Sequence, residues 1–506
     1  MRNRPARRIL LSFRNKALKT VLGFLGLLLI AGCVVGPDYE RPQLAVPVQW
    51  GSGKPQKPAK QPDLSRWWRQ LDDQLLDSLI TEAVGGNLDV AVAKAKIREA
   101  RATYRQQQGA LLPAVEGAAS ATRTRSGASV VGSEPSVYSQ YQAGFDASWE
   151  LDLFGGNRRA LEAARHGAEA AEEDLRDTLV TLVGDVASYY VQAREYQALL
   201  ALARRSSESQ VQTARLTREQ FRAGEATGVD DAKANAQALS TAADIPTYQI
   251  SYAQAVHRLS VLLGQPPTTL EARLNGGGPV PLPKEPVATG IPADVLLNRP
   301  DVRSAERNLA QSTAKIGQAE ANRYPSISLT GSIASSALSP SDLGKKSTLG
   351  WSIGPTLVVP IFQGGQLRAA VDVARAQRDQ SYVAYQAAVL KAMEEVENAI
   401  VSLSQTRTRY AKLGSATASY RRATDLSRTL NEAGAADFFD VLDAERSLYA
   451  AEEAMIRSRA DIAAYFIVLN KALGGGWDGG IDASKPAVVD VDARPRLAHS
   501  RPKVGG

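Results

Sequence analysis

The chain has 506 residues with one cysteine and three histidines, and its formal net charge is +7 at pH 7. The excess charge comes from residues 1–32, which contain seven basic and no acidic residues, so the rest of the chain is formally neutral. A globally basic surface of the kind that binds nucleic acid is therefore not expected. One cysteine also cannot form an internal disulfide framework.

Residues 1–32 have the pattern of a secretory signal peptide. A basic segment precedes the apolar run Val21–Ile30 and small residues up to Cys33, and this run is too short to cross a bilayer as a helix. The ending LIAGC resembles the lipobox of bacterial lipoproteins, which implies that Cys33 starts the mature chain and carries a covalent lipid (palmitate). The alternatives are a simple signal peptide or an unmodified buried thiol. By the same resemblance, Val34 favours the outer membrane.

Internal repetition organises the rest of the chain. Three blocks recur in the same order: Asp89 matches Asp301 and Pro113 matches Pro325, both 212 residues apart; Arg159 matches Arg368, 209 apart; and Gly224 matches Gly434, 210 apart. Such matches indicate two copies of one structural unit of about 200 residues.

The repeats suggest a division of the chain into six segments. After the signal peptide, we expect an extended segment over 33–70, a first repeat over 71–264, a linker over 265–290, a second repeat over 291–477 and a flexible tail over 478–506. The sequence after the signal peptide has no run of 18 or more apolar residues, so a helical membrane span is not predicted.

Each repeat contains a predicted pair of β-strands. Residues 137–153 and 348–361 alternate apolar and polar side chains with period two, and partner strands are expected at 114–126 and 326–336. This alternation is typical of outer-membrane barrel strands, although an exported β-sandwich would alternate too. Four strands cannot close a membrane barrel, and open edges are not tolerated in lipid. Chains would therefore share a barrel, with eight strands from two chains or twelve from three.

Long helices are predicted after each strand pair. No proline occurs between Pro135 and Pro246 or between Pro360 and Pro486. Helices over 157–222 and 366–433 would each be on the order of 100 Å long at ~1.5 Å per residue. Apolar residues within them follow a heptad spacing, which a soluble coiled coil would also show.

An acidic stretch, ADFFDVLDAERSLYAAEE, opens the last predicted helix. Asp440 and Asp443 are three residues apart and share one helix face, but acids near a helix N-terminus are also favoured by the helix dipole. The three histidines are far apart, and the chain has no HExxH, GxSxG or P-loop motif. We therefore predict no enzyme activity, no metal and no cofactor beyond the lipid on Cys33.

Together, the lipobox, the GPDYERP that follows it, the duplicated unit and FDVLDAERSLYAAE resemble the TolC-like outer-membrane efflux proteins. The likeness is to the NodT-type lipoprotein channels of resistance-nodulation-division drug pumps and extends from Cys33 to about Trp477. It implies a mainly α fold with a membrane β-barrel: a homotrimer with twelve shared strands and a periplasmic α-barrel. The implied partners are outer-membrane lipid, a periplasmic adaptor (membrane fusion) protein and an inner-membrane pump.

The implied function is passive export of drugs or other small molecules from the periplasm. The alternatives are an exit duct of a protein secretion system, or a periplasmic coiled-coil scaffold lipoprotein without a pore. The resemblance also implies that Asp440 and Asp443 ring the pore at the periplasmic tip, with Phe439 and Arg446 in the same constriction.

Two departures from the family pattern concern this gate. Asp230 is the first-repeat counterpart of Asp440, but Lys233 stands where a second aspartate would, so the acid pair is not duplicated. Some members hold the tip shut with a tyrosine before the turn glycine and an arginine after it. Asn431 and Ala436 occupy those places here, so the sequence does not predict that bond network for this chain.

Overall fold

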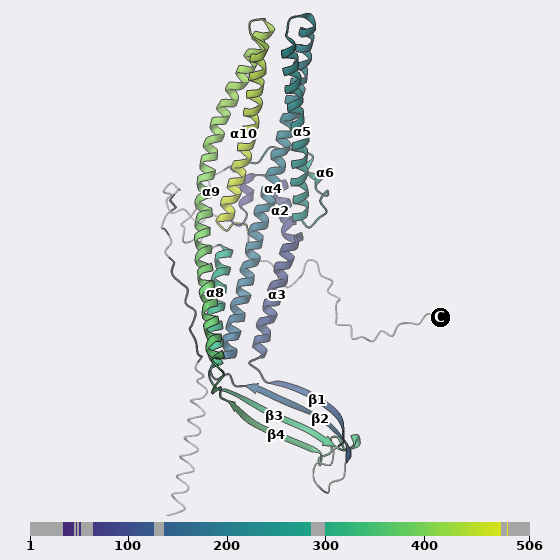
Figure 1. The fold of residues 1–506 in the computed structure, drawn as a ribbon, viewed down its shortest axis with the longest axis vertical. Coiled ribbons are helices and arrows are strands. Elements are labelled where there is room, and N and C mark those ends of the chain that lie inside the picture. Colours follow the sequence, from purple (N-terminus) through teal and green to yellow (C-terminus); the bar gives the residue numbers. More distant parts are fainter. Residues whose placement is uncertain are drawn as a thin grey trace, which may run out of the picture. The chain divides into compact units, whose positions relative to one another are not determined.

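The computed structural model describes residues 34–44, 47, 50, 51, 64–125, 136–284, 299–476 and 483 (Figure 1). The expected signal peptide and Cys33 lie outside the described residues, as do residues 285–298 and nearly all of the tail. The described chain is mainly helical with one four-stranded sheet. This confirms the predicted fold class of a single chain.

The chain divides into two compact units, and each takes segments from both halves of the sequence. Unit 1 comprises residues 1–43, 99–170 and 305–385, and unit 2 comprises residues 44–98, 171–304 and 386–506. The two sequence repeats are therefore interleaved in space rather than folded one after the other.

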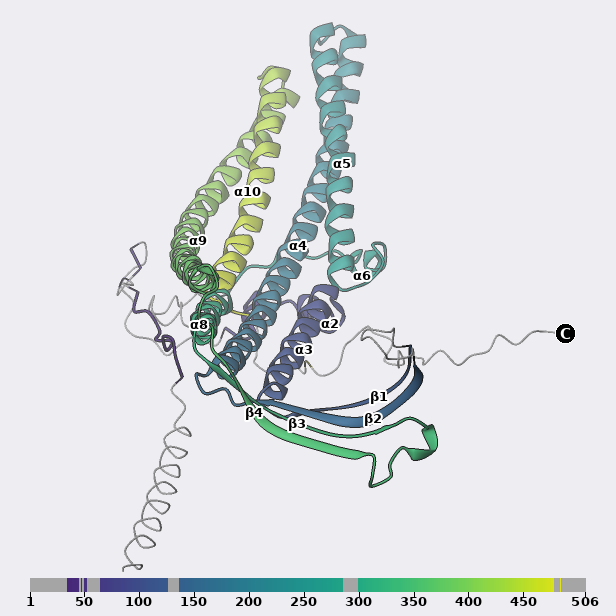
Figure 2. The ribbon, with the colours of Figure 1, turned by 60° about the horizontal axis from the view of Figure 1, so that its bottom comes forward.

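The sheet belongs to unit 1 and is antiparallel throughout (Figure 2). Its strands follow the order of the sequence: β1 (Ala114–Arg125), β2 (Val137–Glu150), β3 (Ser326–Ala337) and β4 (Leu349–Val358). Large apolar side chains such as Phe145 and Trp351 are exposed on it. Within the described residues, no strand pairs with the outer edge of β1 or β4, which leaves unpaired backbone groups on both edges.

The segment after residue 33 is bound to the helices of unit 1. Arg159 is buried and donates hydrogen bonds to the carbonyl oxygens of Val35 and Gly36, both at 3.1 Å, and to Asp38 at 2.8 Å. Gly36 has a positive φ of 89° and lies against Gly317, where an added Cβ would meet the Gly317 Cα at 2.3 Å. Only glycine fits this close approach.

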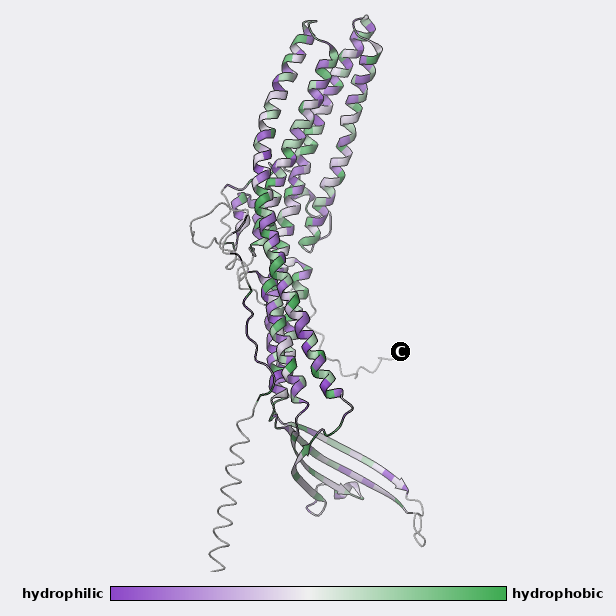
Figure 3. Ribbon diagram, turned by 60° about the vertical axis from the view of Figure 1, so that its left-hand side comes forward, coloured by the Kyte–Doolittle hydropathy of each residue, from purple (hydrophilic) through white to green (hydrophobic). Residues whose placement is uncertain are grey.

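Two helical hairpins make up most of unit 2. The first joins α4 (Gly156–Ala223) to α5 (Gly228–Leu262), and the second joins α9 (Gln366–Glu432) to α10 (Phe438–Ala472). Helices α4 and α9 have 68 and 67 residues, which confirms the predicted long helices. Figure 3 shows apolar and polar residues interspersed along these helices. None of the described helices combines the length and hydrophobicity needed to cross a membrane.

The remaining elements are short or packed beside these hairpins. They are the 3-10 helices η1 (Trp67–Leu71) and η2 (Pro340–Asp342) and the helices α2 (Gln74–Gly86), α3 (Leu88–Gly109), α6 (Glu271–Leu274) and α8 (Pro300–Ala321).

The largest apolar core lies in unit 2, where η1, α2, α4, α5 and α10 meet. The ring of Trp67 meets that of Phe466 edge-on, with centroids 5.8 Å apart. The hydroxyl of the buried Tyr190 donates to the carboxylate of Asp73 at 2.5 Å, and Asp73 caps α2 by accepting from Leu75 and Leu76. The core therefore holds the start of α2 against α4.

The backbone also corrects the alignment of the two repeats. Glycines with positive φ flank both long helices: Gly155 (80°) and Gly224 (82°) around α4, and Gly365 (84°) and Gly434 (71°) around α9. Gly365 lies 210 positions after Gly155, and Gly434 lies 210 positions after Gly224. The predicted match of Arg159 with Arg368, at 209 positions, is therefore wrong by one residue. Arg158 is the structural counterpart of Arg368.

Candidate functional site

The four predicted gate residues all lie at the start of α10. Asp440 and Asp443 are exposed one turn apart, Arg446 follows a turn later, and the side chain of Phe439 is 55% exposed. Within the described residues, no ion pair or side-chain hydrogen bond reaches Asp440, Asp443 or Arg446. The N-cap residue Asp437 makes no side-chain capping bond either. The start of α10 thus presents carboxylates that no neighbour in the described chain neutralises.

Phe439 contacts the tip of the first hairpin. The Nζ atom of Lys233, on α5, lies 5.1 Å from the centroid of the Phe439 ring. A cation over an aromatic face at this distance is attractive. Lys233 therefore steadies the bulky ring at the start of α10.

At the tip of the first hairpin, the acid has a structural role. Thr227 caps α5 by accepting from the backbone N–H of Asp230 at 3.3 Å, and the Asp230 carboxylate accepts from the backbone N–H of Thr227 at 3.0 Å. These bonds form a capping box. The hydrogen bonds from Thr227 hold the pKa of Asp230 below its ordinary value. Arg218 also pairs with Asp231 at 3.1 Å and ties α4 to α5.

The second hairpin closes its turn differently from the pattern with tyrosine and arginine. The Nδ2 atom of Asn431 donates to the Ala436 carbonyl at 3.0 Å, so both residues are used within the turn itself. A hydrogen bond from this hairpin to α4 is made by Arg428, about one helical turn before Asn431 in α9.

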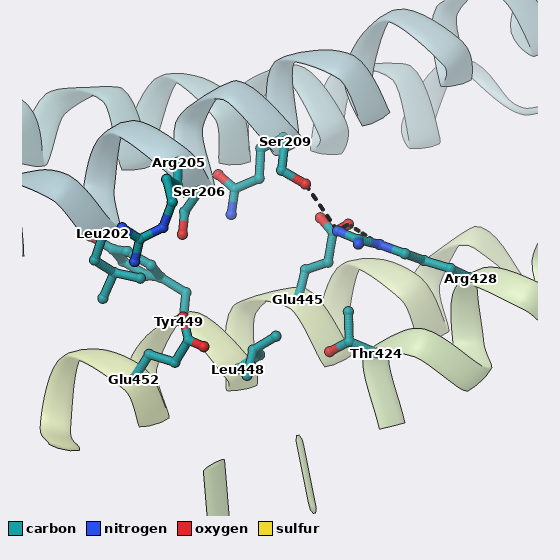
Figure 4. A pocket seen from close by; sticks show the side chains of 11 residues that line it. Leu202, Arg205, Ser206, Ser209, Thr424, Arg428, Glu445, Leu448, Tyr449 and Glu452 are labelled. Atoms are coloured by element: carbon teal, nitrogen blue, oxygen red, sulfur yellow. Dashed lines mark hydrogen bonds and ion pairs between the residues drawn. The ribbon is translucent and has the colours of Figure 1, made fainter. Parts of the chain in front are cut away.

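Arg428 joins three helices (Figure 4). Its Nη2 atom donates to Glu445 on α10 at 2.7 Å and to the hydroxyl of Ser209 on α4 at 2.9 Å. The side chain of Glu445 is only 5% exposed. Its Oε2 atom is buried without a hydrogen-bond partner among the described residues. Glu445 therefore depends on Arg428 for neutralisation.

A polar cavity of about 140 Å³ adjoins this ion pair. The buried Oε1 atom of Gln210, which also lines it, likewise has no partner in the described part of the chain. Figure 4 shows the lining side chains, which include Arg205, Ser206, Thr424, Tyr449 and Glu452. A polar space of this size can hold water, which would supply donors to both acceptors.

The sequence analysis missed the pairing of Arg428 with Glu445. A signal for it existed, because the two residues lie at similar distances on either side of the turn between α9 and α10. In an antiparallel helical hairpin, residues placed in this way lie side by side. Opposite charges in that arrangement predict an ion pair.

The two histidines in the described residues have different acidic neighbours. His166 lies 3.0 Å from Glu169 and His257 lies 3.7 Å from Glu271, whereas His499 is outside the described residues. In the ranges that the structure describes, no three His, Cys, Asp or Glu side chains are arranged to hold a metal ion.

Comparison with known proteins identifies the family. A model of the family described as outer membrane efflux protein matches residues 79–265 and 291–475. The chain belongs to this family. Nodulation protein T of Rhizobium leguminosarum bv. trifolii is 34% identical over 456 residues, covering 89% of this chain and 96% of that protein. Toluene efflux pump outer membrane protein TtgI of Pseudomonas putida is 32% identical over 470 residues, covering 90% and 98%.

A solved structure of the outer-membrane channel OprN has the same fold. It superposes with a TM-score of 0.83 and 34% identity, covering 88% of this chain and all of that one. As an outer membrane efflux protein, this chain is an efflux channel of the bacterial outer membrane that extends into the periplasm. The predicted family, the function as an outer-membrane efflux channel and the location in the outer membrane and periplasm are confirmed. The lipid anchor on Cys33 stays a prediction. The family consists of channel components rather than enzymes.

Proposed function

We propose that three copies of this chain form one channel through which small molecules leave the periplasm passively. The observation that carries this is the four-stranded sheet with two open edges and exposed apolar side chains. Sharing strands between copies satisfies both edges, and three copies of four strands make the twelve-stranded barrel that the family resemblance implies. Exposed apolar side chains on such a barrel would face lipid.

The assembly and the pore are tested separately. Light scattering of the protein in detergent should give the mass of three chains, and a two-chain or one-chain mass would contradict the trimer. Purified protein in planar bilayers should conduct ions. A trimer without conductance would support the alternative of a scaffold without a pore.

Small molecules are proposed as the cargo because TtgI is named for a toluene efflux pump. A periplasmic adaptor and an inner-membrane pump would supply the energy, since the sequence carries no P-loop with which to bind a nucleotide. Deleting the gene should raise sensitivity to toxic organic molecules. A defect confined to secreted proteins would instead favour the exit duct of a secretion system.

Cys33 is proposed to carry a covalent lipid. The docking of Val35 and Gly36 on Arg159 supports this, because it would hold a lipid on Cys33 close to the helices of unit 1. Mass spectrometry of the mature protein should show acylation at Cys33. A free thiol there, or a mature chain that starts elsewhere, would contradict the anchor.

The start of α10 is proposed as the periplasmic gate. If Asp440 and Asp443 of three copies face one axis, their carboxylates repel by ~1 kcal/mol per pair at 4 Å even in water-like dielectric. Acidic rings attract cations and exclude anions. Phe439 would narrow the same opening by its bulk, and Arg446 would line its next turn.

The gate is tested by removing the charges in a matched pair of variants. Asp440→Ala with Asp443→Ala should lose most of the cation selectivity of single channels and their block by trivalent cations. Asp230→Ala with Asp231→Ala removes the same charge from the other tip and should leave selectivity unchanged. Equal selectivity of wild type and both variants, in assembled trimers, would rule out the gate while leaving the channel proposal intact.

A further inference from the structure

The apolar side chains of the sheet lie on one of its two faces. Gly117, Phe145, Ile333 and Trp351 stand opposite one another on adjacent strands, and alternate residues of a strand point to the same face. The odd-numbered positions therefore share a face, and large apolar side chains such as Phe145, Ile333 and Trp351 are exposed on it. The even-numbered positions are mainly polar or small, as at Asp146. In the proposed barrel, the odd-numbered face is the one that meets lipid.

The turn between β3 and β4 folds back over this apolar face. The backbone N–H of Gly344 donates to the hydroxyl of Ser335 at 2.8 Å, and that hydroxyl lies 2.8 Å from the hydroxyl of Thr348. The Thr348 hydroxyl also bonds to the carbonyl oxygen of Asp342 at 2.9 Å. Ser335 occupies an odd-numbered position and is buried. These bonds hold the turn on the lipid-facing side of the sheet.

An open groove of about 510 Å³ lies between this turn and the strands. Large apolar side chains from both parts line it, namely Phe145, Ile333, Leu343 and Leu349. Most of the remaining lining consists of small residues of β1 and β2, namely Gly117, Ala118, Ala119, Ala143 and Gly144. Ala119 and Ala143 pair directly across the two strands, so their small side chains leave space that larger ones would fill. The space and its apolar lining suit an alkyl chain.

The position of the groove along the strands places it in the outer half of the barrel. The helices join the strands at one end of the sheet, and the β3–β4 turn lies at the other end (Figure 2). Tyr141 and Trp149 share the odd-numbered face and stand about 27 Å apart along β2 at ~3.4 Å per residue, which is comparable with the ~25 Å band between the aromatic girdles of a membrane barrel. Ala143, which lines the groove, lies between them and close to Tyr141. The groove therefore opens to lipid chains of the outer leaflet.

Basic side chains gather at the same end of the sheet. Arg123 and Arg125 occupy odd-numbered positions at the end of β1, and Lys345 and Lys346 directly follow Gly344 of the groove. Lys345 pairs with Asp342 at 2.5 Å. The exposed Arg123 and Lys346 form no ion pair within the part of the chain that the structure describes. This end of the barrel thus carries unneutralised positive charge at the level of lipid headgroups, where it attracts anionic groups.

We propose that the groove holds an acyl chain of a phosphorylated glycolipid of the outer leaflet, and that Arg123 and Lys346 bind its phosphate. Lipid A, the acylated and phosphorylated part of lipopolysaccharide, has this chemistry. One such molecule matches both features, because its chain fits the apolar groove and its phosphate meets the basic side chains. The inference rests on the proposed barrel, since the chain has to come from surrounding lipid.

The charges decide which lipid is retained. An acyl chain in a membrane is already in an apolar medium, so entering the groove gains packing contacts and little hydrophobic free energy. All membrane lipids can offer a chain, whereas only an anionic headgroup gains from two cations. A zwitterionic phospholipid should therefore occupy the groove less than lipid A does.

The phosphate contacts are tested with lipid A as the probe. The full-length trimer, delipidated in detergent, is mixed with lipid A or phosphatidylethanolamine, and native mass spectrometry counts the bound lipids. The wild type should retain lipid A in preference. Arg123→Gln with Lys346→Gln should lower the retained lipid A by about fivefold, because the phosphate loses both cations. Arg215→Gln with Lys412→Gln removes the same charge from exposed helix positions and should leave binding unchanged.

The groove is tested at Ala143. Ala143→Leu fills the space without touching the basic residues, so it should also lower the retention of lipid A. The matched control is Ala147→Leu, on the same strand and face but not among the residues that line the groove, and it should bind as the wild type does. Full binding in Ala143→Leu would overturn the groove as the chain site. If that variant fails to assemble, the exposed pair Arg123 and Lys346 still decides the proposal.

Conductance separates this inference from the channel proposal. The changes on the sheet leave its polar face intact, so each assembled variant should conduct as the wild type does. A conducting trimer that binds lipid A no better than phosphatidylethanolamine, or equally well with and without Arg123 and Lys346, would overturn the lipid site and leave the channel standing. A protein that neither trimerises nor conducts would overturn both.

Discussion

The tips of the two helical hairpins have the same turn but use their acids in opposite ways. Both turns contain a glycine with positive φ, Gly224 and Gly434. In the first tip, Asp230 is bound in a capping box with Thr227. In the second tip, its counterpart Asp440 is exposed and Asp437 makes no capping bond. The backbone is preserved in both repeats, whereas the side chains have diverged.

The two copies of the tip are therefore stabilised in different ways. The first tip is stabilised locally, by the capping box and by the pair of Arg218 with Asp231. The second tip has no such cap and is held from below by Arg428 and Glu445. The carboxylates of Asp440 and Asp443 are therefore free to interact with something outside the chain.

The largest expected effect comes from Arg428→Met. This change leaves the buried Glu445 without its cation, so local opening of the second tip should become easier by about 2 kcal/mol. Hydrogen exchange of the amides at the α9–α10 turn would measure it.

Two further variants complete the test of Arg428. Arg421→Met breaks a more exposed pair with Glu452 and should cost less than about 1 kcal/mol. Combining Arg428→Met with Glu445→Leu should recover much of the loss, because no buried charge remains. Equal exchange in Arg428→Met and wild type would show that the second tip is held by other contacts.

Asp230→Ala should destabilise the first tip by about 1 kcal/mol through loss of the capping box. Asp440→Ala at the equivalent position should change the stability of its own tip by less than about 0.5 kcal/mol, since only the interaction with the helix dipole is lost. Hydrogen exchange of both tips in each variant compares them directly. Similar losses in the two tips would mean that Asp440 also has a capping role.

Lowering the pH should destabilise the first tip more than the second without any substitution. The pKa of Asp230 is lowered in the folded chain. Its carboxylate therefore stabilises the first tip fully above the ordinary pKa of aspartate, and this stabilisation is lost as the pH falls from that value through the folded pKa. Exchange at pH 3, corrected for intrinsic rates, should show fraying of the first tip beyond that of the second. The excess should disappear in Asp230→Ala.

The smallest expected effect comes from Asp437→Thr, which would rebuild the capping box of the first tip in the second. The introduced threonine would then bond with Asp440 as Thr227 does with Asp230, and the second tip should gain about 0.5 kcal/mol. If Asp440 is a gate residue, engaging its carboxylate should also lower cation selectivity slightly. Asp437→Ala is the control, and it should bring no gain in stability, because alanine cannot form the capping bond.

The sequence by itself determined the regular elements, because their signals are local. Period-two alternation predicted four strands, and the absence of proline with heptad spacing predicted helices that the structure shows as α4 and α9. These patterns arise from the geometry of a strand and a helix and do not depend on distant residues. Motifs at Cys33 and around Asp440 led to the family, which the comparisons confirmed. The alignment of the repeats failed by one residue at Arg159, because no insertion is visible until the glycines show their φ angles.

Only the tertiary structure decided which acids are engaged and which are free. Asp230 and Asp440 both occupy the first turn of a helix, and the sequence does not show that Thr227 binds one of them while nothing in the described chain binds the other. Arg428 neutralises Glu445 on α10 and donates a hydrogen bond to Ser209 on α4, and so joins three helices. Burial and hydrogen bonding are properties of packed neighbours that are far apart in the chain, so they follow from the arrangement of the helices and not from their local pattern.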